Sequence, residues 1–166
     1  MKTLILGLGN PILTDDGVGV LVAEAVRSRL PYGTPVDINE VSVGGLTLME
    51  SMIGYDRVIL IDALQLKKGK PGTVHRLSLE DLAAISPTQH SASPHDASLV
   101  TALETGRRMG LRLPEDIVIY AIEVENITDF NDQPTPSVSA AIPEVAAAVL
   151  NDVNSLTEEA SWSRRS

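Results

Sequence analysis

The stretch Leu4-Ile-Leu-Gly-Leu-Gly-Asn-Pro-Ile-Leu-Thr-Asp-Asp-Gly-Val-Gly19 decides the fold. It begins with a nearly continuous apolar run that ends in glycine, which is typical of a strand buried on both faces of a parallel sheet. Apolar residues then recur at helical spacing over 18–30, with Thr14 or Asp15 placed to cap that helix. In open α/β sheets ligands bind beyond the carboxyl ends of the strands. We therefore expect the pair Asp15 and Asp16 to lie where chemistry takes place.

The rest of the chain repeats this alternation. Further strands are predicted over 36–43, 57–61, 73–77 and 116–124, and helices over 46–53, over 96–109, and from Ser137 or Ser139 through Val153. This order predicts an α/β fold, a three-layer α/β/α sandwich with a mostly parallel, mixed five-stranded sheet. The strand at 73–77 follows its predecessor after only a turn, which is too short for a parallel crossover, so one strand is expected to be antiparallel.

Three local features complete this outline. The apolar residues of 36–43 change phase partway along, which predicts a bulge or a local twist in that strand. The polar stretch 86–93, followed by Pro94, predicts a loop able to move. Residues 1–156 are expected to form a single domain, and the polar residues 157–166 a tail that frays.

Composition excludes several functions. The 166 residues carry a formal net charge of −9, which argues against a nucleic-acid or anionic-membrane partner, because phosphate binding needs a basic surface. The absence of cysteine excludes disulfides, thiolate metal sites and cysteine nucleophiles, and is compatible with a reducing cytoplasm. The opening apolar run is short, is interrupted by Gly7 and Gly9, and meets two aspartates, so it is not expected to be a signal peptide or a membrane span.

Two carboxylates and one imidazole stand out as candidate site residues. Asp62 ends an otherwise apolar strand, where burial is costly unless the carboxylate caps a turn, pairs or binds a cation. Asp16 opens the first helix, and His95 precedes the helix at 96–109; each has an alternative reading as a helix cap. Together Asp16, Asp62 and His95 form a plausible three-ligand set for Ni, Zn, Co or Fe, with positions left for water or substrate. His75 and His90 are predicted to be bystanders.

Two other kinds of site are disfavoured. The Gly7-x-Gly9 turn has Ile12 where a dinucleotide fingerprint needs its third glycine, so no nucleotide cofactor is expected. The chain also has no Gly-x-Ser-x-Gly elbow to support a serine nucleophile.

Four motifs in this order resemble the maturation endopeptidases of nickel–iron hydrogenases. They are the opening Gly-x-Gly-Asn-x-x-x-x-Asp-Asp-x-x-Gly over Gly7–Gly19, then Asp62-Ala63, then His95 in Ser-Pro-His, and then Thr135-Pro-Ser-Val138. The resemblance covers essentially the whole chain. It places the family's metal-binding and catalytic triad on Asp16, Asp62 and His95.

The resemblance implies a cytoplasmic, aspartyl-type endopeptidase. Its partner is the hydrogenase large-subunit precursor, from which it removes a C-terminal extension after nickel insertion, cutting behind a His or Arg. The nickel belongs to the substrate and is sensed by the triad. Members often carry Asp-Gly-Gly-Thr after the second strand, whereas this chain has Val43-Gly-Gly-Leu46.

Two alternatives remain open. The residue Val43 leaves room for a non-catalytic, nickel-sensing chaperone of the same precursor. Peptidyl-tRNA hydrolases also share Gly-Leu-Gly-Asn-Pro, seen here at Gly7–Pro11, but they continue with Thr-Arg-His-Asn where this chain has Thr14-Asp-Asp-Gly17. The negative charge also disfavours tRNA.

Overall fold

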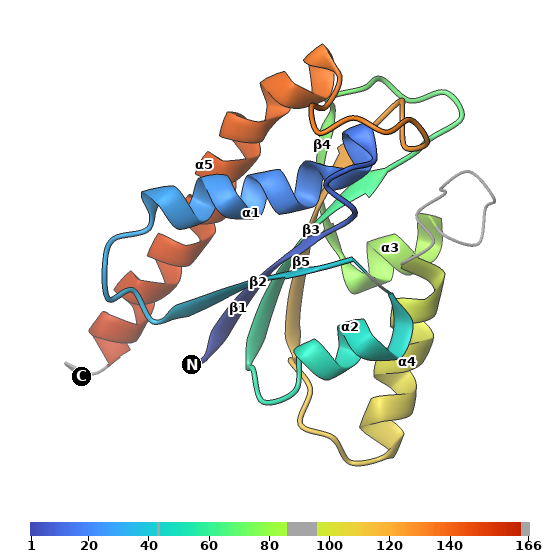
Figure 1. The fold of residues 1–166 in the computed structure, drawn as a ribbon. Coiled ribbons are helices and arrows are strands. Elements are labelled where there is room, and N and C mark those ends of the chain that lie inside the picture. Colours follow the sequence, from blue (N-terminus) through green and yellow to red (C-terminus); the bar gives the residue numbers. More distant parts are fainter. Residues whose placement is uncertain (43, 86–95, 164–166) are drawn as a thin grey trace.

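The structure is a computed structural model that describes residues 1–42, 44–85 and 96–163. These residues form one five-stranded sheet with the order β2-β1-β3-β5-β4 (Figure 1). The strands are β1 Thr3–Leu8, β2 Val36–Val41, β3 Arg57–Leu64, β4 Val74–Ser78 and β5 Asp116–Glu123. The helices are the 3₁₀ turn η1 Thr14–Gly17, α1 Val18–Arg29, α2 Gly45–Ser51, α3 Leu79–Ile85, α4 Asp96–Arg108 and α5 Pro136–Ser163.

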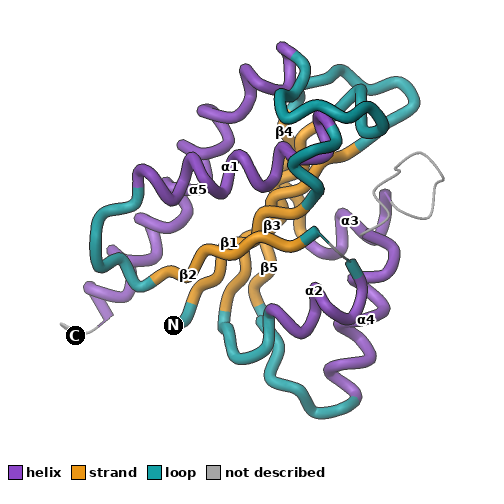
Figure 2. Tube along the Cα trace, in the orientation of Figure 1, coloured by secondary structure: helices purple, strands orange, loops and turns teal. Residues whose placement is uncertain are grey.

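Helices cover both faces of the sheet, which confirms the predicted three-layer sandwich. α1 and α5 lie on one face of the sheet, and α2, α3 and α4 lie on the other (Figure 2). Alternate residues of β3 point to these opposite faces: Ile59 and Ile61 pack with α1 and α5, whereas Val58 and Leu60 pack with α2, α3 and α4. Because β3 is central and covered on both sides, it reads as a continuous apolar run. None of the helices in 1–42, 44–85 and 96–163 has the length and apolarity needed to cross a lipid bilayer.

The antiparallel strand is also confirmed. β1, β2, β3 and β5 run parallel, and β4 pairs antiparallel with β5 at the edge of the sheet, in the register His75↔Ala121. The short connection over 65–73 lets the chain reverse direction past the end of β3, but it cannot carry the chain back to start a parallel strand.

Three features differ from the sequence-based expectation. β2 pairs with β1 in unbroken register from Thr3↔Val36 to Leu8↔Val41, so of the two alternatives predicted for this strand the bulge is excluded. β3 continues past Ile61 to Leu64, because β5 still pairs with it after β1 has ended. α5 stays helical to Ser163, so residues 157–163 of the expected tail are helical. The loop predicted at 86–93 and the departure at Val43 lie outside the described residues.

Helix α1 begins directly over the carboxyl ends of β1 and β3. A Cβ atom on Gly19 would lie 2.2 Å from the backbone oxygen of Ile61 and 2.4 Å from that of Leu8. Backbone carbonyls cannot move aside as a flexible side chain can. Glycine at position 19 therefore lets the helix pass close enough to the strands to hold η1 at their carboxyl ends, which we call the carboxyl edge of the sheet.

Gly19→Ala is expected to lower the free energy of unfolding by at least about 2 kcal/mol, because the overpacking outweighs the gain of about 1 kcal/mol in helix propensity. Gly106→Ala in α4 is the matched control, since the three atoms nearest to a Cβ there all belong to side chains, of Leu113 at 2.8 Å, Met49 at 2.9 Å and Leu111 at 3.5 Å. Urea unfolding should show Gly106→Ala within about 1 kcal/mol of the unmodified protein. Equal losses in both variants would contradict this account.

Candidate functional site

Asp16 lies on η1, just beyond the end of β1. The backbone N–H of Asn10 donates to Asp16 Oδ2 at 2.7 Å, which fixes the half-buried carboxylate against the turn that leaves the strand. Gly9 has a φ of +124°, and a Cβ there would lie 1.8 Å from the backbone oxygen of Asp16. The glycine of the opening motif is therefore required for the turn to approach Asp16 so closely.

Asp62 lies inside β3, not at its end as expected. β1 pairs with β3 only as far as Gly7↔Ile61, so the next backbone N–H on that side, from Ala63, has no strand to pair with. Asp62 Oδ1 accepts this N–H at 2.8 Å, and the residue is only 4% exposed. Alternate side chains of a strand point to the same face, so Asp62 points with Leu60 and Leu64 to the face covered by α2, α3 and α4.

His95 lies outside the described residues, so its contact with the two carboxylates stays a prediction. Helix α4 begins at the next residue, Asp96, and runs back toward the start of β5 (Figure 1). Because α4 ends shortly before β5 begins, its first turn lies toward the carboxyl ends of the parallel strands. Leu99 of α4 packs in the same cluster as Leu64, on the face to which Asp62 points. Within 1–42, 44–85 and 96–163, no three His, Cys, Asp or Glu side chains are grouped to hold a metal ion.

Asp15 has a different role from the neighbouring aspartate. The expectation that it caps the first helix was wrong, because neither η1 nor α1 has a side-chain cap. Its fully buried carboxylate accepts N–H groups from Glu125 at 3.2 Å, Asn126 at 3.1 Å and Thr135 at 2.7 Å, and the hydroxyl of Thr135 at 2.9 Å. Asp15 thus anchors the irregular segment 124–135 against the edge where Asp16 lies.

His75, predicted to be a bystander, pairs with a buried acid. Its Nε2 lies 2.8 Å from Oε1 of Glu123, which is only 6% exposed, and Glu123 Oε2 accepts the backbone N–H of Lys70. Sequence reasoning missed Glu123, although it ends the apolar run of β5 in the same way that Asp62 follows the apolar run of β3. The criterion that selected Asp62, an acid that follows an apolar run, therefore also applies to Glu123.

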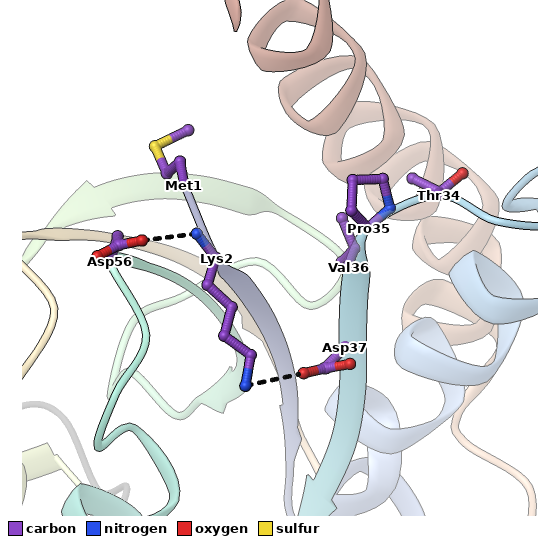
Figure 3. Close-up of a pocket in the computed structure, with 7 residues that line it drawn as sticks. All are labelled: Met1, Lys2, Thr34, Pro35, Val36, Asp37 and Asp56. Atoms are coloured by element: carbon purple, nitrogen blue, oxygen red, sulfur yellow. Dashed lines mark hydrogen bonds and ion pairs between the residues drawn. The ribbon is translucent and has the colours of Figure 1, made fainter.

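A surface pocket of about 420 Å³ lies at the opposite edge, where β1, β2 and β3 begin (Figure 3). Both of its carboxylates are paired: the Lys2 backbone N–H donates to Asp56 at 2.6 Å, and Lys2 Nζ lies 3.6 Å from Asp37. The Lys2 N–H first, and the Arg112 guanidinium next, lower the pKa of Asp56. This hydrogen bond and these ion pairs tie the amino ends of the strands together, away from the carboxyl ends at which open α/β sheets bind ligands.

The comparisons with known proteins point to one family. A family model for hydrogenase maturation proteases, HycI, matches residues 20–152, a range that includes Asp62 and His95 and begins after Asp16. The hydrogenase 2 maturation protease of Escherichia coli (strain K12) is 31% identical over 150 residues, covering 90% of this chain and 89% of that protein. HupD, a hydrogenase expression/formation protein of Rhizobium leguminosarum bv. viciae, is 26% identical over 152 residues, covering 90% and 74%.

Comparison with solved structures identifies the same family. The hydrogenase maturating endopeptidase HybD from E. coli superposes with a TM-score of 0.80 at 30% identity, covering 93% of each chain. The [NiFe] hydrogenase maturation protease HybD from Thermococcus kodakarensis has a TM-score of 0.71 at 24% identity, covering 92% of this chain and 99% of that one, and supports the fold. The chain belongs to the hydrogenase maturation protease family, which confirms the resemblance read from its motifs. It is a peptidase.

Proposed function

We propose that this protein removes the C-terminal extension of a nickel–iron hydrogenase large-subunit precursor after nickel insertion. Family membership supports the activity, and the position of Asp16 and Asp62 at the carboxyl edge of the sheet supports the site. In this proposal Asp16, Asp62 and His95 face the nickel of the substrate. The reaction takes place in the cytoplasm, where the precursor is made.

The two described carboxylates differ in a way that suits this role. Among the described residues, only Asn10 donates to Asp16, and it occupies Oδ2, so Oδ1 is available to a metal ion or a water molecule. Asp62 uses Oδ1 for Ala63 and is held rigidly in a central strand. A rigid and a half-exposed acid together provide oxygen ligands in a fixed position, with imidazole from His95 as the nitrogen ligand.

The proposed chemistry is hydrolysis of one peptide bond. A water molecule attacks the scissile carbonyl carbon, and its hydroxyl joins the acyl carbon. The C–N bond breaks, and the remaining proton of that water passes to the leaving amine. The triad binds the nickel of the precursor and thereby places the scissile bond beside a carboxylate able to accept the proton. A precursor without nickel cannot be positioned in this way, so cleavage waits until the metal is in place.

The test is to incubate the purified protein with nickel-loaded precursor and to measure the mass of the large subunit. The expected result is loss of a mass equal to the C-terminal extension, and no loss from nickel-free precursor. Binding of the loaded precursor without any change in its mass would instead identify a chaperone and contradict the proposal. Equal cleavage of loaded and nickel-free precursor would contradict the role of nickel.

A further inference from the structure

The connection between β3 and β4 carries three of the thirteen basic side chains of an acidic protein within four residues. Lys67, Lys68 and Lys70 are three of the four lysines in a chain of net charge −9. All three are exposed, and in the described part of the chain none takes part in an ion pair. We call residues 67–70 the lysine loop.

The lysine loop lies at the edge of the sheet that carries the candidate site. It follows β3 shortly after Asp62, and it lies beside the segment 124–135 at the same end of the molecule (Figure 1). Of the segments that follow the four parallel strands β1, β2, β3 and β5, only this one contains Lys or Arg. The lysine loop is therefore the positive part of an edge whose other charged side chains, such as Asp16 and Asp129, are acidic.

The backbone of the lysine loop is held in place before any partner binds. Glu123 accepts the N–H of Lys70 with its carboxylate and the N–H of Gly72 with its backbone oxygen, the latter at 2.8 Å. His75 holds the other carboxylate oxygen of Glu123 at 2.8 Å. Gly72 adopts a φ of +88°, and a Cβ there would lie 2.5 Å from the backbone oxygen of Ser137. An ordered loop loses little conformational entropy on binding, which favours a docking role.

We infer that the lysine loop docks an acidic surface of the hydrogenase precursor next to the cleaved tail. This inference rests on the proposed function and adds the partner chemistry that steers the precursor to the site. Complementary charge at the rim of an interface mainly accelerates association and orients the partner. A net charge of −9 disfavours an extended polyanion such as RNA, because three lysines are too few to offset the repulsion.

The test compares two double variants that remove the same charge from opposite edges of the sheet. Lys67→Gln/Lys68→Gln is expected to raise KM about threefold to tenfold at low ionic strength, with kcat unchanged. Arg107→Gln/Arg108→Gln, at the exposed far end of α4, should leave both constants unchanged. At about 0.5 M salt the two variants and the unmodified protein should converge, because the interaction is screened.

Binding of fluorescently labelled precursor to the same proteins gives a readout that needs no cleavage. If the unmodified protein fails to cleave but its binding still weakens only in the lysine variant, the proposed activity fails and the docking inference stands. Equal KM and equal affinity in both variants would overturn the inference. So would tight binding of single-stranded RNA that is lost in the lysine variant, since this would assign the loop to a nucleic acid.

Discussion

Asp16→Asn is expected to slow processing of the precursor by at least about a hundredfold. The substitution removes the negative charge that faces the nickel but keeps an oxygen able to accept the Asn10 N–H, which is 2.7 Å from Oδ2. The free energy of unfolding should therefore stay within about 1 kcal/mol of the unmodified protein. Initial rates from the mass of the large subunit, together with urea unfolding followed by circular dichroism, measure both effects.

Substitution of Asp16 tests the site more specifically than substitution of Asp62. Asp62 is 4% exposed and accepts the Ala63 N–H inside a central strand, so a substitution there changes folding and activity together. Asp132→Asn is the matched control, because it removes the same charge from an exposed position in the neighbouring segment 124–135. We expect the control to process precursor at the normal rate. Normal processing by Asp16→Asn would show that this carboxylate is not part of the site.

Asp15→Ala is expected to lower the free energy of unfolding by about 3–5 kcal/mol, a large part of the 5–15 kcal/mol typical of a domain. The variant leaves the backbone N–H groups of Glu125, Asn126 and Thr135 without the buried acceptor that they share. Asp15→Asn should lose less, because the amide keeps one acceptor oxygen. Urea unfolding measures the ranking, and far-ultraviolet circular dichroism checks that each variant still folds.

The control for this ranking is Asp132→Ala, which removes an exposed carboxylate that has no hydrogen bond to the described residues. Its unfolding free energy should stay within about 0.5 kcal/mol of the unmodified protein. A loss of less than about 1 kcal/mol for Asp15→Ala would mean that the segment 124–135 is held by other contacts, such as the Thr14 hydroxyl bound to the Asp129 backbone oxygen at 2.7 Å.

Local patterns were sufficient for most of the fold. The apolar runs of β1 and β3 predict central strands because a strand covered on both faces has no polar side. The short turn before β4 predicts an antiparallel strand because a parallel crossover needs more chain. The phase change in β2 produces no bulge because its apolar residues serve both faces of the sheet: Val36 and Ile38 pack on one face and Val41 packs on the other, while the register with β1 is unbroken.

The candidate site was only partly accessible to the same reasoning. Asp62 was found because an acid inside an apolar run is costly, and the structure shows it buried at the carboxyl edge. Glu123 was missed, although the same criterion applies to it. His95 was selected from its position before a helix and from family resemblance. The structure adds that α4 starts on the face of the sheet to which Asp62 points.

The class of fold, the family, and the end of the strands at which the acids lie could all be read from the amino-acid sequence, because each depends on short local patterns and on their order along the chain. The different roles of Asp15 and Asp16 become visible only in the folded protein. The two are adjacent and chemically identical, and what distinguishes them is a segment 110 to 120 residues away that brings its N–H groups to Asp15 alone. Which acid becomes an anchor and which stays open to a substrate depends on distant backbone groups that leave no local pattern.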